Sequence, residues 1–220
     1  MLRFKSAMLT TAIIMVFVCV PARGTVITDP SNDFLSTFAG THSADLDVLS
    51  VFATFDGTTF HIGANLNGNV GTLPSALYVF GFNRGAANNN FSSLGLPGIV
   101  FDAVITMTAA GVTGGRDLVS NTPIALPLGA AKISGSTFQI DIPASLLPSQ
   151  GLAPLQYGIN LWPRDASVPA GDTQIADFAP NSTDFNASAV PEPSSAALLT
   201  IGVISGALLA LRKKPMRERA

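Results

Sequence analysis

Residues 48–66, with the sequence VLSVFATFDGTTFHIGANL, decide the fold. Apolar side chains alternate with polar or small ones on both sides of Asp56-Gly57, which is a strong signal for a β-hairpin. The positions predicted to face inward are Leu49, Val51, Ala53, Phe55, Phe60, Ile62, Ala64 and Leu66. We therefore expect two antiparallel strands that each bury one face.

The rest of the middle of the chain repeats this pattern. Alternating or short apolar runs occur at residues 76–82, 99–108, 132–134, 137–142 and 155–161, and clusters of Gly, Pro and Asn separate them. Strands at this spacing are typical of an antiparallel β-sandwich. We predict one all-β domain over residues 25–189, with one short helical turn at 143–148.

The composition limits the size of this domain and its partners. The chain has 220 residues, of which 12% are charged and 47% are hydrophobic, enough for one core but too few for two full domains. Residues 25–189 contain twelve Asp, no Glu and four basic residues, a net charge of −8. A body this acidic is not expected to bind nucleic acid or an anionic membrane surface.

Residues 1–24 are predicted to be a signal peptide. Arg3 and Lys5 precede an apolar run at residues 9–20, and small residues follow before Gly24. This order is typical of secretory signals, and the apolar run is short for a helix that spans a membrane. Cleavage after Gly24 would remove Cys19, the one cysteine of the chain, so the exported domain would fold without disulfide bonds.

Residues 190–220 have the pattern of a C-terminal membrane anchor. An uncharged segment at residues 196–211 is followed by Arg212, Lys213 and Lys214. A transmembrane helix over this segment would be about 24 Å long, so the flanking basic side chains would extend it to the membrane interface. The basic end is expected to stay cytoplasmic, which places the β domain on the far side of the membrane.

The triplet Pro191-Glu192-Pro193 precedes the apolar segment. Together with the helix and the basic end, it resembles the C-terminal sorting signal of the PEP-CTERM family of exported bacterial proteins. The resemblance implies that an exosortase-type membrane protease recognises this tail and cuts near the triplet. It also implies transient membrane anchoring, followed by release or by transfer to the cell surface and its polysaccharide matrix.

The domain itself carries a second, weaker resemblance. The order Asp45-Leu46-Asp47, then Asp56-Gly57, then a strand that ends at Asn83 is similar to DOMON-like and family-nine carbohydrate-binding β-sandwiches. Asn83 stands where those proteins more usually have an aspartate. The resemblance implies a ligand-binding sandwich and assigns no binding residue.

These features predict a non-catalytic protein of the cell surface or extracellular matrix, exported across the inner membrane, with a role that could include glycan binding. Its expected partners are the export machinery, the exosortase-type protease and extracellular polysaccharide. No catalytic residue is assigned, because the domain lacks a Gly-x-Ser-x-Gly elbow and cysteine, and His42 and His61 show no catalytic pattern. The alternatives are a secreted polysaccharide hydrolase that uses an Asp pair, and a calcium-stabilised adhesive module that pairs with copies of itself.

Trp162 and Arg164 are the candidates for a ligand platform. Trp162 shares strand parity with the polar residues Gln156 and Asn160, so its ring is expected on the outer face, close to Arg164. A flat aromatic face beside polar groups suits sugar recognition. The alternative is that the indole caps the end of the core.

No cofactor is expected, with calcium as the open alternative. Three groups of aspartates are candidates for a metal site: Asp29 with Asp33, Asp45 with Asp47, and Asp165 with Asp172 and Asp177. Calcium prefers carboxylates beside loop carbonyls, although short Asp side chains also cap turns without any metal. None of the three groups has the spacing of an EF-hand, so the hypothesis is a single structural site.

Overall fold

The computed structural model describes residues 24–190, which build an all-β, sandwich-like unit without an α-helix. The first sheet has the strand order β1-β2-β3-β11-β10, and β14 also pairs with β2. Its strands are β1 (Val26–Thr28), β2 (Val48–Phe55), β3 (Thr59–Leu66), β10 (Ala131–Ser134), β11 (Thr137–Pro143) and β14 (Ser188–Ala189). All of its pairings are antiparallel except that of β14 with β2.

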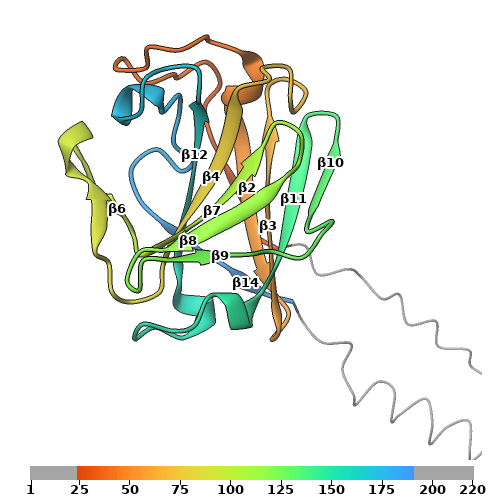
Figure 1. The fold of residues 1–220 in the computed structure, drawn as a ribbon, viewed down its shortest axis with the longest axis vertical. Helices are drawn as coiled ribbons and strands as arrows, with labels where there is room; N and C mark the ends of the chain where they lie inside the picture. The colour runs from red at the N-terminus through yellow and green to blue at the C-terminus, as the bar shows by residue number, and fades with distance from the viewer. Residues whose placement is uncertain (1–23, 191–220) are drawn as a thin grey trace, which may run out of the picture. The chain divides into compact units, whose positions relative to one another are not determined.

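The second sheet has the order β13-β12-β4-β7-β8-β9, and a separate hairpin joins β5 to β6 (Figure 1). Its strands are β4 (Ala76–Asn83), β7 (Ala103–Thr108), β8 (Thr113–Asp117), β9 (Thr122–Ile124), β12 (Gly158–Asp165) and β13 (Phe185–Asn186). The hairpin strands are β5 (Asn89–Phe91) and β6 (Leu96–Phe101). Short 3-10 helices lie at Ala44–Leu46, Ser92–Leu94, Ala144–Leu146, Pro154–Gln156 and Asp172–Gln174.

The predicted hairpin at residues 48–66 is confirmed as β2 and β3, joined at Asp56-Gly57. Gly57 has a φ of 98°, a conformation that only glycine adopts without strain. One detail differs, because a bulge between Val48 and Ser50 turns Val48 into the core in place of Leu49. The remaining alternation holds along both strands.

The other predicted strands are confirmed with shifted limits. The run at 99–108 divides at Asp102 into β6 and β7, because the chain turns there from the hairpin into the sheet. The run at 155–161 begins as a 3-10 turn, and β12 starts only at Gly158 and continues to Asp165. The helical turn expected at 143–148 is present at Ala144–Leu146.

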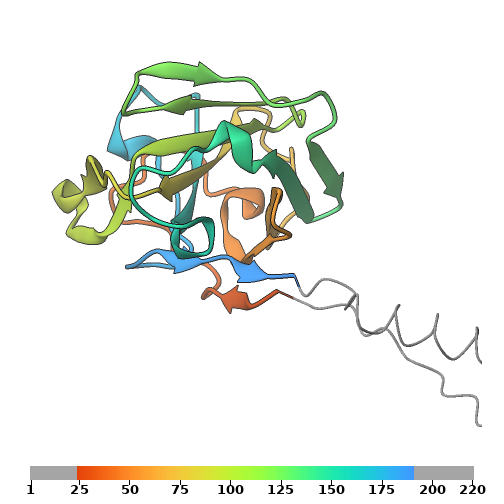
Figure 2. The same cartoon turned by 90° about the horizontal axis from the view of Figure 1, so that it is seen from below.

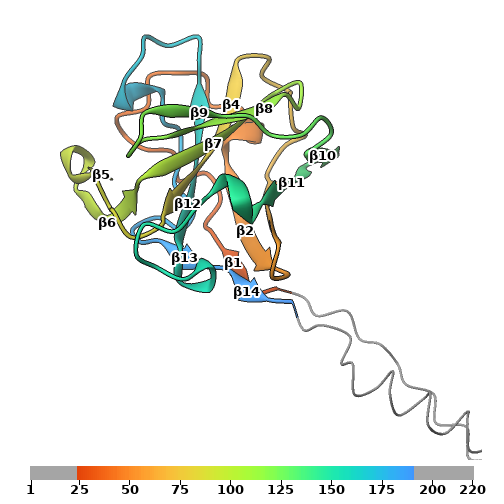
Figure 3. The same cartoon turned by 60° about the horizontal axis from the view of Figure 1, so that its bottom comes forward.

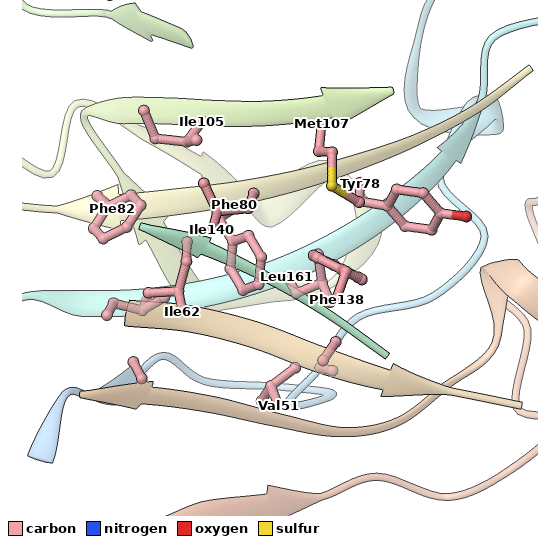
Figure 4. Close-up of a cluster of buried hydrophobic side chains, with 14 of the residues drawn as sticks. Val51, Ile62, Tyr78, Phe80, Phe82, Ile105, Met107, Phe138, Ile140 and Leu161 are labelled. Carbon is pink, nitrogen blue, oxygen red and sulfur yellow. The ribbon is translucent and has the colours of Figure 1, made fainter. Parts of the chain in front are cut away.

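The core lies between the inner faces of the two sheets (Figure 4). β3 and β11 contribute Ile62, Phe138 and Ile140, and β4 contributes Tyr78, Phe80 and Phe82 from the opposite sheet, all at most 2% exposed. The Tyr78 and Phe138 rings meet across the layers with centroids 5.0 Å apart. Burial of these large side chains is the main stabilising contribution, at about 1.5–3 kcal/mol for each side chain.

A smaller apolar cluster covers the outer face of the second sheet. It consists of Val79, Phe91, Ile99, Trp162, Ile175 and Phe178, contributed by β4, β12, the β5–β6 hairpin and the segment before β13. The central strands β4 and β12 are therefore buried on both faces, which explains why residues 76–82 are apolar at nearly every position.

Both ends of the described chain lie on one edge of β2 (Figures 2 and 3). β1 pairs with residues 50–52 of β2, and β14 pairs with Thr54 and Phe55, so the two short strands follow one another along this edge. The Thr25 N–H donates to Ser188 Oγ at 2.9 Å, and the Val190 N–H donates to the Phe55 carbonyl at 3.0 Å. The chain thus enters and leaves the sandwich at neighbouring points.

Residues 1–23 and 191–220 lie outside the described residues. They include the predicted signal peptide except Gly24, the Pro191-Glu192-Pro193 triplet, the predicted helix at 196–211 and the basic residues that follow it. Between residues 24 and 190, no helix has the length and apolar character needed to cross a membrane.

Candidate metal centre

Three aspartates from distant parts of the sequence meet at one edge of the sandwich. Asp29 directly follows β1, Asp33 lies in the next loop, and Asp177 belongs to the segment that precedes β13. Each residue offers one carboxylate oxygen to a group in which all of these atoms lie within 4.8 Å of one another. Asp177 connects this edge to both sheets, because its neighbours Ile175 and Ala179 form bridges to β12 while its own side chain reaches β2.

Two of the three carboxylates accept hydrogen bonds from neighbouring donors, and Asp29 is held through its backbone. Asp177 Oδ2 accepts the Val48 N–H at 2.9 Å, and its Oδ1 accepts the Phe178 N–H at 2.7 Å. Asp33 Oδ2 accepts from the Asn181 side-chain amide at 2.8 Å. The backbone of Asp29 donates to the Leu49 carbonyl at 2.9 Å. The group is therefore positioned by both sheets and by the loop before β13.

Two carboxylate oxygens of these residues are buried without a hydrogen-bond partner, although Asp29 and Asp33 as whole residues are only partly buried. Asp29 Oδ2 and Asp33 Oδ1 have less than 1 Å² of exposed surface and accept no hydrogen bond. Asp177 is only 1% exposed. No Lys, Arg or His of residues 24–190 forms a salt bridge with any of the three. Buried carboxylates normally have a compensating charge or a full set of donors, and among the described residues these two oxygens have neither.

The electrostatics agree with this geometry. Burial raises the pKa of Asp29 to about 7, and the nearby charges of Asp33 and Asp47 act in the same direction. Burial also raises the pKa of Asp177 to about 8, although the Val48 N–H opposes the rise, and Asp29 and Asp33 add to it. A cation between the carboxylates would reverse these shifts, because it favours the ionised forms.

The other predicted Asp groups do not assemble into metal sites. Asp45 and Asp47 bind different partners: Asp45 Oδ2 accepts the Leu73 N–H and the Tyr78 hydroxyl, whereas Asp47 accepts the Asn32 N–H and the Asn67 amide. The group of Asp165, Asp172 and Asp177 is also divided. Asp165 holds loops through Thr41, Ser75 and Ser167, and Asp172 accepts from the Ser93 hydroxyl. Only Asp177 of that group joins the candidate centre.

The second buried acidic site is fully paired. Arg84, which is completely buried, donates from Nε to Asp102 Oδ1 at 2.6 Å, and its Nη1 lies 2.9 Å from Asp117 Oδ2. Burial alone would raise the pKa of Asp117, but the Arg84 hydrogen bond and the Ser120 and Val119 N–H groups outweigh it and lower the pKa to about 2. This site has no free ligand position for a metal.

His61 lies in a third, partly exposed acidic cluster. Its Nδ1 is 2.7 Å from Asp141 Oδ1 and its Nε2 is 3.2 Å from Asp56 Oδ2, and Lys132 Nζ donates to Asp141 Oδ2 at 2.6 Å. Partial burial would lower the pKa of His61, but the hydrogen bonds to Asp141 and Asp56 outweigh it and raise the pKa. The cluster borders an open hollow of about 340 Å³ near Pro127 and Leu128.

The prediction that Trp162 is an exposed platform is wrong in this structure. The Trp162 side chain does face away from the main core, as expected from its position in the strand. The β5–β6 hairpin and Phe178 cover it, however, and leave only 2% of the residue exposed. The ring lies over Gly81, where any side chain would overlap with it. Arg164 is half-buried and donates from Nη2 to the Gly171 carbonyl at 2.7 Å, so it holds a loop.

Sequence patterns could identify only part of the metal centre. Asp29 and Asp33 are four residues apart and were predicted as a pair, but Asp177 lies 144 residues beyond Asp33. Only the fold brings this segment to the edge of β2, so no local signal marks Asp177 as their partner.

Searches against protein-family models, curated proteins and solved structures found no match for this chain.

Proposed function

We propose that this chain is an exported, non-catalytic protein of the cell surface or extracellular matrix, and that its C-terminal segment is a sorting signal for an exosortase-type protease. The arrangement of the two ends on β2 is the observation that supports this proposal most. β14 ends at Ala189, one residue before Val190 and two before the Pro191-Glu192-Pro193 triplet. Cleavage at the triplet, like cleavage after Gly24, would therefore leave every strand of the sandwich intact.

The aspartates of the domain also support a structural role over a catalytic one. Most of them accept backbone N–H groups and so fix loops and strand ends, as Asp45, Asp47, Asp56, Asp102, Asp117, Asp165 and Asp177 do. A glycoside hydrolase needs two carboxylates about 5–10 Å apart on either side of a substrate. One carboxylate oxygen from each of Asp29, Asp33 and Asp177 lies within 4.8 Å of the others, and Asp177 is buried while the other two are partly buried. This spacing fits a bound ion better than a sugar ring.

Sorting can be tested with an epitope tag inserted beside Leu128, a fully exposed loop residue. The tagged full-length chain is produced in a bacterium that has an exosortase-type protease, and its cell fractions are examined by immunoblotting. We expect a shortened product at the cell surface or in the medium. Pro191→Ala, Glu192→Ala and Pro193→Ala together should leave the longer chain in the membrane fraction.

The matched control is Pro215→Ala with Glu218→Ala, which changes the same residue types in the basic tail. This variant should be processed as the wild type is. Recovery of the full-length chain from the cytosol, or normal processing of the triplet variant, would contradict the proposal.

Glycan binding is a second candidate function, and a hollow on the outer face of the first sheet favours it. The hollow has a volume of about 330 Å³, and its lining includes Phe52, Lys132 and Gln139. Phe52 lies beside Gly63, which has no side chain, so one face of the hollow is an aromatic ring flanked by polar groups. This combination suits a sugar ring better than the covered Trp162 does.

The test is retention of the protein on purified extracellular polysaccharide. Phe52→Ala should abolish retention, whereas Leu128→Ala, which removes an exposed apolar side chain in a different hollow, should not. Equal retention of both variants would exclude this surface as the glycan site.

A further inference from the structure

We propose that Asp29, Asp33 and Asp177 together bind one hard divalent cation, Ca²⁺ by preference, and that this ion fastens the segment around β1 to the sandwich. Binding of this ion does not depend on how the chain is sorted. Three features favour it: the spacing of the three carboxylates, the two oxygens without a partner and the elements that the residues join.

The spacing fits a single ion. Calcium lies about 2.4 Å from its oxygen ligands, so two ligands on opposite sides of it are about 4.8 Å apart. The three carboxylate oxygens here lie within 4.8 Å of one another, so one ion can contact all of them. Magnesium has shorter bonds of about 2.1 Å and requires near-ideal octahedral geometry, which makes it the poorer fit.

The unpartnered oxygens provide an independent indication of a ligand. Asp29 Oδ2 and Asp33 Oδ1 are shielded from solvent and accept no hydrogen bond, while other donors already hold Asp177 and the second oxygen of Asp33. A cation bound by the three residues would give these two oxygens the partner that they lack. Because the site has only carboxylates and no His or Cys, its chemistry favours calcium over zinc or copper.

The position of the ligands gives the ion a mechanical role. Asp29 directly follows β1, whose three residues pair only with β2, and Asp177 is anchored between β12 and Val48 at the start of β2. An ion shared by these residues connects the first strand to the body of the sandwich. Calcium binding should therefore reduce opening of the segment from β1 to Asp33.

The experiment uses the full-length chain in a mild detergent, freed of metal and titrated with CaCl₂ in a calorimeter. We expect one Ca²⁺ to bind per chain, more tightly than Mg²⁺. Asp33→Asn should weaken binding by roughly tenfold or more, because it removes one of three charged ligands. Asp29→Asn serves as a second variant, and near-ultraviolet circular dichroism verifies that each variant is folded.

The matched control is Asp172→Asn, the same change at an aspartate outside the group, and it should bind calcium as the wild type does. Hydrogen exchange of residues 24–33 should slow when calcium is added to the wild type. The absence of binding at millimolar Ca²⁺, or equal losses in Asp33→Asn and Asp172→Asn, would overturn the assignment of the site. Binding without any change in exchange would overturn the role of the ion in fastening β1.

Discussion

Two buried groups of aspartates in this domain differ in one respect, their counter-charge. Asp102 and Asp117 surround the buried guanidinium of Arg84, and their oxygens also accept backbone N–H groups. Asp29 and Asp33 show the opposite case, because Asp29 Oδ2 and Asp33 Oδ1 are buried and have neither a cation nor a hydrogen-bond donor as a partner within residues 24–190. Burial of a carboxylate therefore does not by itself indicate whether it has a structural role or binds a ligand. The paired group belongs to the architecture, whereas the unpaired oxygens of Asp29 and Asp33 are the feature on which the proposed ion site rests.

The largest expected effect comes from breaking the paired group. Arg84→Met leaves two buried carboxylates without their cation, and removal of one partner from a buried ion pair costs about 3–5 kcal/mol. The free energy of unfolding, measured by urea denaturation, should fall by that amount. Arg116→Met is the control, because Arg116 is exposed and its guanidinium donates to Asn121 and not to a carboxylate. Its effect should stay within about 0.5 kcal/mol. Similar losses in the two variants would mean that the ion pairs of Arg84 do not stabilise the fold.

The next effect comes from the ion itself. At a calcium concentration about 100-fold above the dissociation constant, binding adds about 2.7 kcal/mol to the free energy of unfolding. A chelator should remove this increment from the wild type and also from Arg84→Met, since the two groups share no residue. Asp33→Asn should lose little on chelation. A wild-type chain whose melting temperature is the same in calcium and in chelator would contradict this prediction.

The sequence could predict the features that depend on local signals, but not those that depend on tertiary packing. The β2–β3 hairpin follows from alternation and from Asp56-Gly57, which are local signals. Five strands were missed because they have only two or three residues each, too few for alternation to show: β1, β5, β9, β13 and β14. β8 was also missed, because its sequence TGGRD has no apolar alternation. Trp162 was assigned to the correct face of β12, but the covering hairpin β5–β6 depends on tertiary packing that strand parity does not specify.

The same distinction applies to the acidic residues. Asp without Glu indicates turn capping, and most aspartates do accept backbone N–H groups near turns and strand ends. Which carboxylates meet is decided by strand order, because Asp177 reaches the others only through its place beside β12. A sequence motif for this site could be found only after the topology was known.

A smaller effect is expected for Asp33→Asn, whose change in the free energy of unfolding should have opposite signs in chelator and in calcium. In chelator, Asp33→Asn removes like-charge repulsion against Asp29 and keeps an oxygen that can accept from Asn181, so it should stabilise the domain by about 1 kcal/mol. In calcium, the same change should destabilise it relative to the wild type, because a ligand is lost. Thermal unfolding under the two conditions measures both signs, and a change of the same sign in both would show that no ion binds there.

The smallest effect is expected at the partly exposed cluster of His61, Asp56 and Asp141, whose carboxylates have a cationic partner but share it with solvent. Because the pKa of His61 is raised above 6.5, its contribution to stability is complete below about pH 6.5 and is lost as the pH rises through the raised value. Partial burial opposes ionisation of Asp141, but hydrogen bonds from Lys132, His61 and Gln139 lower its pKa to about 2, so its contribution is lost only as the pH falls towards 2.

His61→Gln isolates the histidine in this cluster. The difference in unfolding free energy between the wild type and the variant should be below about 1 kcal/mol at pH 5.5, because partly exposed ion pairs are screened by solvent. It should shrink further by pH 8.5, and measurement in chelator at both pH values excludes any contribution from metal binding. Lys132→Gln is the companion variant and should reduce stability at both pH values, since a lysine stays charged throughout. A difference for His61→Gln that grows with pH would mean that the imidazole is held neutral, and the cluster would then resemble the unpaired buried group more than the paired one.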